Sequence, residues 1–367
     1  MEGELRVAMT LEQCWHRVPG GTGVAGIGMA RSVDALDDIQ VIGVAAAHRA
    51  APPAAWLPPV EVRHLPLPRL ALYEAWHRLR LPRVERATGS VDVIHATTFA
   101  IPPRSAPLIV TIHDLAFLND PAHFTRRGVS FFKRGFELAG RDADLIVCPS
   151  EATAAHCAAS GIDQARLRVV PMGVEAEAAS EDDVRAAKQR YGLDRPYVLW
   201  LGTVEPRKNL ARLIEAFVAL DEQDVDLALV GPKGWNEDLE GLVADKRDRI
   251  KILGFVPHVD LAPLYAGAEL FCFPSLFEGF GLPVLEAMAQ STPVVTSRGT
   301  STEEISGDAA VLVDPLDAEA ITNGMKQVLG DESVRTELGD KGRERAAGYS
   351  WRRTAEGLQE IYLEVTR

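Results

Sequence analysis

The chain carries, at residues 273–286, the sequence FPSLFEGFGLPVLE. The apolar run before it predicts a buried strand that ends near Phe273. Pro283 predicts a helix start, because proline is well tolerated at a first helical position. Glu278 lies in the intervening loop, and Glu286 is expected in the first helical turn, whose free N–H groups attract anions. The stretch therefore predicts a phosphate site with two carboxylates beside it.

Two glycines in the same loop suit a backbone that comes close to a ligand. Gly279 and Gly281 have no Cβ, so neither a positive φ nor a close approach is penalised. A purely structural interpretation is also open. A glutamate stabilises a first helical turn without any ligand, and Gly and Pro interrupt many ordinary loops.

A second segment, GTVEPRKN at residues 202–209, follows an apolar strand expected at residues 197–201 and precedes an amphipathic helix. Arg207 and Lys208 therefore lie at the carboxyl end of a strand. Ligands of open α/β sheets bind at that edge, and adjacent cations there suit a phosphate. We expect both side chains to face a phosphate held by the first motif.

Together these segments resemble the retaining glycosyltransferases of family 4, whose fold is called GT-B. The resemblance rests on the EPRKN run at residues 205–209, the E-x7-E pair Glu278 and Glu286, and the HD pair at residues 113–114. It implies an α/β protein of two Rossmann-like domains whose parallel sheets face a central cleft. The first domain would receive the acceptor, and the second would bind the nucleotide-sugar.

The resemblance also implies roles for single residues. Arg207 and Lys208 would stabilise the departing diphosphate, Glu278 would lie near the sugar hydroxyls, and Glu286 would bind the ribose. His113 would lie beside the transferred sugar, although a lone histidine after a strand is usually structural. The resemblance also implies donor binding by Gly20, Gly21, Gly279, Phe280, Gly281 and Leu282.

The segment at residues 19–28, PGGTGVAGIG, predicts a glycine-rich turn that leads into a helix through Asp37. It contains Gly21-x-Gly23-x-x-Gly26, which has the pattern of a dinucleotide fingerprint. The turn comes about ten residues after the first strand, and no acidic residue stands correctly after the second, so the pattern is weak evidence for a dinucleotide.

The length and the net charge of the chain limit its domain count and its possible partners. A chain of 367 residues suggests about two domains, and the net charge of −13 argues against nucleic acid as a partner. We expect domains at 1–172 and 173–349, and the resemblance implies that the C-terminal helix 350–367 packs back on the first. Strands are expected near Val7, Val41, Val62, Val93, Ile109, Ile146, Val169, Val198, Leu227, Ile250, Leu270, Val294 and Val311.

Nothing in the sequence resembles a signal peptide, and no apolar run approaches the roughly 18 residues of a membrane span. We therefore expect a cytoplasmic protein. Four cysteines without C-x-x-C spacing are interpreted as reduced, packed thiols. They are Cys14, Cys148, Cys157 and Cys272.

Residues 68–86 predict a basic amphipathic helix. Leu72, Trp76 and Leu79 repeat at helical spacing, and the other faces are basic. The cations in question are Arg69, Arg78, Arg80 and Arg83, with a second cluster at Arg126, Arg127, Lys133 and Arg134. One interpretation is a solvated face over a core-packed stripe. The other is peripheral contact with an anionic membrane at its inner face, or with an acceptor phosphate.

The predicted reaction transfers a sugar from a nucleotide diphosphate to a hydroxyl of a glycan, lipid-linked or small-molecule acceptor, with retention. No cofactor or metal is expected, because Arg207 and Lys208 can replace a divalent ion. The EPRKN run resembles that of mannosyltransferases, which implies GDP-mannose as the donor; UDP-glucose, UDP-galactose and UDP-N-acetylglucosamine stay open. The alternatives are a nucleotide-sugar epimerase, an NAD-dependent oxidoreductase and a non-catalytic sensor. A glycoside hydrolase would need its acids to flank a scissile bond.

Overall fold

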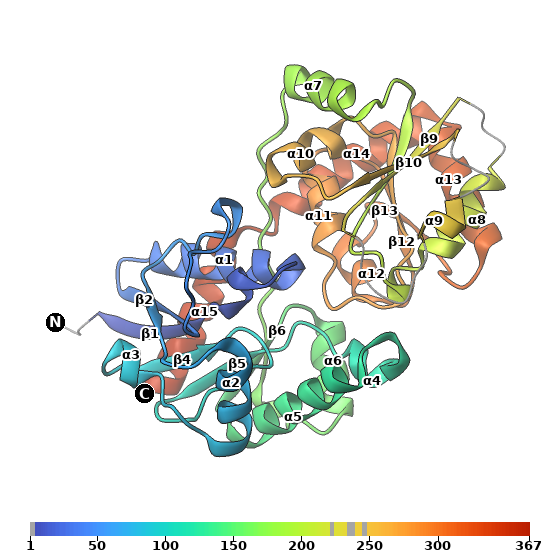
Figure 1. Cartoon of the computed structure of the whole chain (residues 1–367). Helices are drawn as coiled ribbons and strands as arrows, with labels where there is room; N and C mark the ends of the chain where they lie inside the picture. The colour runs from blue at the N-terminus through green and yellow to red at the C-terminus, as the bar shows by residue number, and fades with distance from the viewer. Residues whose placement is uncertain (1–3, 221–223, 233–238, 244–247) are drawn as a thin grey trace. The chain divides into compact units, whose positions relative to one another are not determined.

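The computed structural model describes residues 4–220, 224–232, 239–243 and 248–367. The chain divides into two α/β units (Figure 1). The first comprises Met1–Gly173 with Ser350–Arg367, and the second comprises Val174–Tyr349. The expected boundaries lie within one residue of these.

The described part of the first unit contains a seven-stranded, all-parallel sheet in the order β3-β2-β1-β4-β5-β6-β7. Its strands are β1 Leu5–Thr10, β2 Ile39–Ala45, β3 Val62–His64, β4 Val93–Ala96, β5 Leu108–Thr111, β6 Leu145–Cys148 and β7 Leu167–Val169. The order reverses between β1 and β4, as in doubly wound sheets. All seven expected strands of this unit are found.

The second unit repeats this plan. Its described residues form a six-stranded parallel sheet in the order β10-β9-β8-β11-β12-β13. The strands are β8 Tyr197–Leu201, β9 Asp226–Val230, β10 Ile250–Gly254, β11 Leu270–Phe273, β12 Val294–Ser297 and β13 Ala310–Val313. Here the order reverses between β8 and β11. The predicted fold class, two Rossmann-like units with parallel sheets, is confirmed.

Helices connect the strands within each unit. Those of the first unit are α1 Gly20–Asp34, α2 Arg69–Glu74, α3 Glu85–Thr88, α4 Ala116–Asn119, α5 Arg126–Asp142, α6 Glu151–Ala159 and α15 Trp351–Thr366. Those of the second are α7 Glu181–Tyr191, α8 Leu210–Val218, α9 Leu239–Val243, α10 His258–Ala266, α11 Leu282–Ala289, α12 Ser301–Ser306, α13 Ala318–Leu329 and α14 Glu332–Ala347. Many begin at a side-chain cap, such as the Ser150 hydroxyl that accepts from the Thr153 N–H at 3.1 Å.

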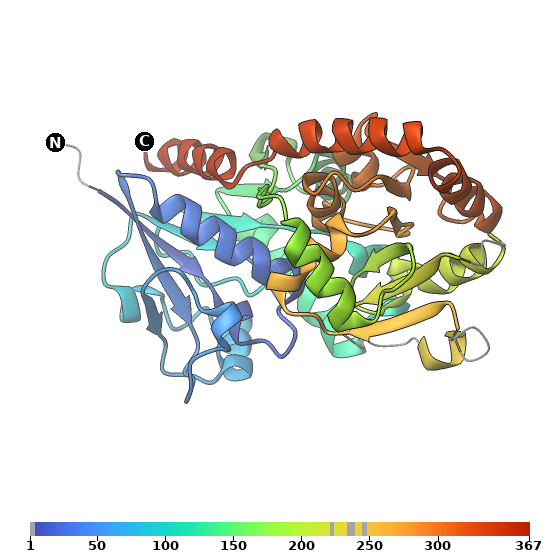
Figure 2. The ribbon, with the colours of Figure 1, turned by 90° about the horizontal axis from the view of Figure 1, so that it is seen from above.

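The C-terminal helix α15 packs against α1 and β4 of the first unit, and Figures 1 and 2 both show it beside α1. Its buried face includes Leu358, Ile361 and Tyr362. The Tyr362 hydroxyl lies 2.7 Å from Nδ1 of His95, a buried residue of β4. The other ring nitrogen, Nε2, lies 2.7 Å from the hydroxyl of the buried Thr111, so both nitrogens of this buried histidine have a partner.

The expectation of a glycine-rich turn at residues 19–28 was wrong. Helix α1 already begins at Gly20, so the later glycines are helical. Glycine suits these positions because neighbouring side chains approach the helix backbone closely. A Cβ on Gly26 would overlap the Gln13 side chain, and one on Gly28 would overlap the Trp351 indole. Close packing around the helix thus accounts for Gly23 and Gly26 of the dinucleotide-like pattern, whereas a Cβ on Gly21 would meet no atom within 4 Å.

The expectation of one regular helix over residues 68–86 was also wrong. Helix α2 continues into a π-helical turn at Ala75–Leu79, which adds a residue to the turn and shifts the buried face. Leu72 and Trp76 are buried as expected, whereas Leu79 is 70% exposed and His77 is buried in its place.

The four cysteines are buried thiols, as expected. Within the described residues, no helix has both the length and the apolar character that spanning a bilayer requires.

Candidate active site

The two motifs follow neighbouring strands at the point where the strand order of the second unit reverses. Arg207 and Lys208 lie in the short 3-10 turn η6, Pro206–Lys208, after β8, and Glu278 lies in the loop between β11 and α11. Ligands of open α/β sheets bind outside the carboxyl ends of the strands at this reversal. The fold therefore brings together three predicted catalytic residues at a favoured ligand position.

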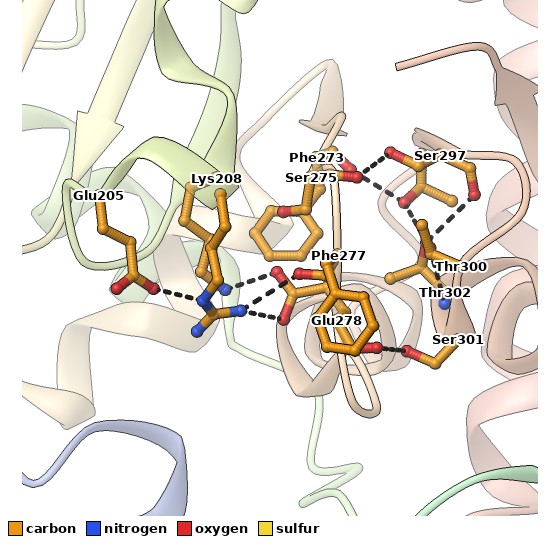
Figure 3. A network of polar contacts seen from close by, with 12 residues as sticks. Glu205, Lys208, Phe273, Ser275, Phe277, Glu278, Ser297, Thr300, Ser301 and Thr302 are labelled. Carbon is orange, nitrogen blue, oxygen red and sulfur yellow. Dashed lines mark hydrogen bonds and ion pairs between the residues drawn. The ribbon is translucent and has the colours of Figure 1, made fainter. Parts of the chain in front are cut away.

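Figure 3 shows the polar network that these residues form. Nζ of Lys208 lies 2.6 Å from Oε1 of Glu278, and NH1 of Arg207 lies 3.0 Å from Oε2 of the same carboxylate. Nε of Arg207 also pairs with Glu205 at 2.7 Å. The ammonium of Lys208 lies 4.8 Å from the centre of the Phe273 ring, a cation–π distance. Two cations thus share two carboxylates in a buried cluster.

Burial and charge act on the ionisation of this cluster. Burial raises the pKa of Glu278, but Lys208 and Arg207 outweigh it, and the pKa lies below its usual value. Burial lowers the pKa of Lys208, and the neighbouring Arg207 lowers it further against the pull of Glu278 and Glu205. The carboxylate of Glu278 is therefore ionised at neutral pH and balances the cations.

Asn209 fixes the loop that carries the two cations, a role the sequence did not reveal. Its backbone is left-handed, with φ of 60°, and its side-chain Nδ2 donates to the carbonyls of Pro274 at 2.9 Å and Pro315 at 2.7 Å. The backbone carbonyl of Arg207 accepts from the N–H of Leu276 at 2.8 Å. These bonds tie the loops after β8 and β11 to each other.

A hydroxyl network supports the loop of Glu278 from the other side and was also missed. The Ser301 hydroxyl donates to the Glu278 carbonyl at 2.9 Å. The Thr302 hydroxyl accepts from Thr296 at 2.9 Å, and Ser297 donates to the Ser275 carbonyl at 2.6 Å (Figure 3). The available signal was that these residues end or follow β12, the next strand of the sheet.

Glu286 lies elsewhere than expected. Helix α11 has Gly281 as its N-cap, at φ of 109°, and Pro283 in its first turn, which places Glu286 fifth in the helix, beyond the first turn. Its carboxylate accepts a 2.9 Å bond from the Tyr265 hydroxyl. Burial raises its pKa, with Tyr265 acting in the opposite direction. The two acids of the motif therefore have different partners and shifted pKa values of opposite sign.

The four residues 279–282, which lie between Glu278 and Glu286, are buried. Phe280 packs edge-on against Tyr349 at 6.0 Å, and Leu282 is buried at the start of α11. Gly279 and Gly281 complete this stretch. Contacts from these four residues to a ligand would thus come from the backbone.

The other candidates belong to the first unit. His113 follows β5, and its Nε2 lies 3.0 Å from the Thr97 carbonyl. Burial lowers its pKa, so the imidazole is neutral at neutral pH. Gly20 and Gly21 open α1, Gly20 has φ of 59°, and a Cβ on either would meet no atom within 4 Å. Their surroundings are open, in contrast to the tightly packed glycines that follow.

Across the described residues, no group of three or more His, Cys, Asp or Glu side chains is arranged to hold a metal ion. The cations of the cluster are therefore the positive charges that the described site itself provides.

Two family models together match most of the chain. The model described as "Glycosyltransferase Family 4" matches residues 19–178, and "Glycosyl transferases group 1" matches residues 183–345. Each match falls almost wholly within one of the two units.

Curated relatives agree with the family models. The chain is 32% identical over 270 residues to the O-antigen chain mannosyltransferase B of Escherichia coli, covering 71% of each protein. It is 32% identical over 239 residues to the GDP-mannose-dependent alpha-(1-6)-phosphatidylinositol monomannoside mannosyltransferase of Mycolicibacterium smegmatis, covering 60% of this chain and 63% of the relative.

Among solved structures, the fold resembles that of Anabaena Alr3699/HepE in complex with UDP-glucose. The TM-score is 0.77, with 20% identity over 98% of this chain and 100% of the other, which shows a shared fold. With the two family models and the relatives, it follows that this chain is a glycosyltransferase of the GT-B fold and belongs to the group 1 and family 4 glycosyltransferases.

Proposed function

We propose that this glycosyltransferase is a retaining mannosyltransferase that uses GDP-mannose and needs neither metal nor cofactor. Its acceptor is a hydroxyl of a glycan, a lipid-linked sugar or a small molecule. The observation that supports the proposal is the pair of cations at the strand-order reversal, the buried Lys208 and the half-buried Arg207. The mannosyl donor is supported by the two mannosyltransferase relatives, one of which is named as GDP-mannose-dependent.

Each site residue takes a role that its surroundings suit. Breaking the bond between the sugar and the diphosphate places negative charge on the diphosphate, and fixed cations there lower the barrier. Arg207 and Lys208 provide that charge. Glu278 binds sugar hydroxyls, Glu286 binds the ribose, and His113 contacts the transferred sugar as a neutral imidazole. The backbone of the loop before α11, together with Gly20 and Gly21, contributes N–H donors.

A donor panel tests the reaction. Purified protein is incubated with an alkyl α-mannoside and GDP-mannose, UDP-glucose, UDP-galactose or UDP-N-acetylglucosamine, and release of nucleoside diphosphate is measured. We expect release with GDP-mannose, an α-anomeric product by NMR, and unchanged activity in excess EDTA. A β-anomeric product would refute retention, and loss of activity in EDTA would refute metal independence.

The same panel separates the alternatives. An epimerase consumes donor without any acceptor, an oxidoreductase changes NADH absorbance, and a sensor binds nucleotide without turnover. A thermal-melt panel with UDP, GDP, ADP and NAD complements it, because a ligand at 100 times its Kd stabilises a protein by about 2.7 kcal/mol. We expect GDP to raise the melting temperature of the wild type and not that of Lys208→Ala.

We further propose that the first unit contacts an anionic membrane, where a lipid-linked acceptor would be found. Its α2 and π-turn segment exposes Leu70, Leu79 and Leu81 at 53%, 70% and 57%. The exposed cations of the neighbouring α5 include Arg126, Arg127, Lys133 and Arg134. Exposed leucines beside cations suit the interface of an anionic bilayer.

Arg80, which we expected among the cations on the outer faces of residues 68–86, stabilises the fold of the first unit instead. Its guanidinium donates to the carbonyls of Trp76, Ile101 and Pro102 at 2.7, 2.9 and 2.6 Å and pairs with Asp142 at 2.8 Å. A substitution there would damage the unit and could not report on lipid binding.

The membrane test therefore uses other positions. Leu79→Ser with Leu81→Ser, and separately Lys133→Glu with Arg134→Glu, should each reduce co-sedimentation with phosphatidylglycerol vesicles. Arg185→Glu, an exposed change on α7 of the second unit, is the matched control. Equal binding by all variants, or equal binding to phosphatidylcholine vesicles, would refute the membrane contact.

A further inference from the structure

Glu205 is a buried member of the cation cluster that the reaction as described does not use. It is the N-cap of η6, and its carboxylate pairs with Nε of Arg207 at 2.7 Å. Its backbone carbonyl accepts from the N–H of Lys208 at 3.0 Å. The carboxylate and the two cations are therefore held in one turn of the backbone.

Arg207 is shared between two carboxylates that come from different loops. Glu205 takes Nε, while Glu278 takes NH1, whose other acceptor is the Phe277 carbonyl at 3.3 Å. A guanidinium is planar and its donors point in fixed directions. A partner held at Nε consequently sets where the remaining N–H groups point.

The two carboxylates differ in what donor binding would do to them. A diphosphate that reaches Arg207 and Lys208 competes with Glu278, because Glu278 accepts from both cations. In the proposed function, Glu278 then binds sugar hydroxyls. Glu205 contacts Arg207 from within the same turn, so it can keep its bond to Nε while a phosphate takes the NH1 edge.

We infer that Glu205 is a positioning residue for donor binding: it orients the Arg207 guanidinium toward the diphosphate after Glu278 has changed partners. The inference rests on the proposed function, and it adds a carboxylate to a site that must bind an anion. A nearby acid would ordinarily weaken anion binding by repulsion. Here the gain from a fixed guanidinium has to exceed that cost.

The test is a double-mutant cycle of Glu205→Ala and Arg207→Ala, with Glu205→Gln as the conservative variant. GDP affinity is measured by calorimetry, and kcat and KM with GDP-mannose. Without the bond at Nε the guanidinium must be ordered when the diphosphate binds, so we expect Glu205→Ala to weaken GDP binding severalfold, by up to about tenfold. Glu205→Gln keeps an acceptor oxygen for Nε and should restore most of the affinity.

The cycle separates orientation from a structural role. If Glu205 acts through Arg207, its removal has no further effect in Arg207→Ala but keeps its full effect in Lys208→Ala. KM for the donor should rise more than kcat falls, because the diphosphate is charged in the bound donor as well as in the transition state. Asp260→Asn, which removes a buried carboxylate paired with Arg190 in the same unit, should leave GDP affinity unchanged.

Different results overturn different statements. Equal losses from Glu205→Ala with and without Arg207 would mean that Glu205 supports the turn itself, and the inference would be wrong. Tighter GDP binding by Glu205→Ala would mean that repulsion dominates, with the same consequence. A folded wild type that binds neither GDP nor UDP would overturn the proposed function together with this inference.

Discussion

The Tyr265 hydroxyl donates a 2.9 Å hydrogen bond to the carboxylate of Glu286, whose pKa burial raises. The phenol favours the ionised carboxylate, so it opposes the effect of burial. Two adjacent elements of the second unit, α10 and α11, therefore set the ionisation of the acid that we assign to the ribose.

Tyr265→Phe should make donor binding more sensitive to acid. Loss of the hydrogen bond raises the pKa of Glu286 further, so GDP affinity should begin to fall at a higher pH than in the wild type as the solution is acidified. Calorimetric titrations from about pH 8 to 5 measure this. Tyr191→Phe, which alters a tyrosine bound to Asp260, is the control. Superimposable pH profiles for Tyr265→Phe and the wild type would contradict the assignment of Glu286.

Glu278→Gln should separate nucleotide binding from transfer. Removing the negative charge releases Lys208 and Arg207 from a competing carboxylate, so GDP alone should bind severalfold more tightly. Transfer should fall by about tenfold or more, because the neutral amide makes weaker bonds to sugar hydroxyls than the carboxylate. Binding is measured by calorimetry and turnover by nucleotide release. Weaker GDP binding by Glu278→Gln would contradict the exchange of partners at the cations.

Acid should destabilise the first unit through three histidines whose pKa values are lowered in the folded chain. Burial lowers the pKa of His16 and His77 to about 4 and that of His95 to about 3, from 6.5. As the pH falls, the unfolded chain binds these protons before the folded chain does. The stability that the neutral histidines contribute is therefore fully present above pH 6.5 and is lost as the pH falls toward 4. Each proton contributes a slope of about 1.4 kcal/mol per pH unit.

Hydrogen exchange followed by mass spectrometry locates this effect within the chain. Protection of the β-strands of the first unit should decrease between pH 6.5 and 4 once intrinsic exchange rates are corrected. His77→Gln should reduce the pH dependence by about one proton. An unchanged slope in that variant would contradict the role of His77.

Gly28→Ala should destabilise the first unit, because its Cβ would overlap the Trp351 indole of α15. Overpacking of this kind typically costs about 1–3 kcal/mol, which chemical denaturation measures. Gly21→Ala in the same helix is the matched control, since a Cβ there meets no atom within 4 Å. If both variants are equally stable, the contact between α1 and α15 is looser than described.

The sheets were predictable because parallel strands covered on both faces have continuous apolar sequences. Val93-Ile-His-Ala96 is one example, and even His95 within it is buried. The helical part was less predictable. The sequence of residues 69–80 did not indicate the π-turn, because the extra residue depends on how Trp76 and His77 pack against the rest of the unit.

The cluster itself was predicted in part. Arg207, Lys208 and Glu278 follow neighbouring strands, so their meeting followed from strand order. The partners of these residues did not, because Glu205 and Asn209 act through side-chain geometry that spacing does not encode. Glu286 was misplaced because one residue of uncertainty at the helix start decides whether a side chain lies in the first turn or beyond it.

The N–H of Val174 donates to the carbonyl of Tyr349 at 3.0 Å, so the first and last residues of the second unit are hydrogen-bonded to each other. Residues 174–349 are thus an insertion whose ends meet, the arrangement in which domain grafting and circular permutation succeed. This segment can therefore be exchanged as a single unit. Exchanging it with its counterpart from a relative would move the cation cluster and both motif glutamates as one block, with only two peptide junctions to rebuild.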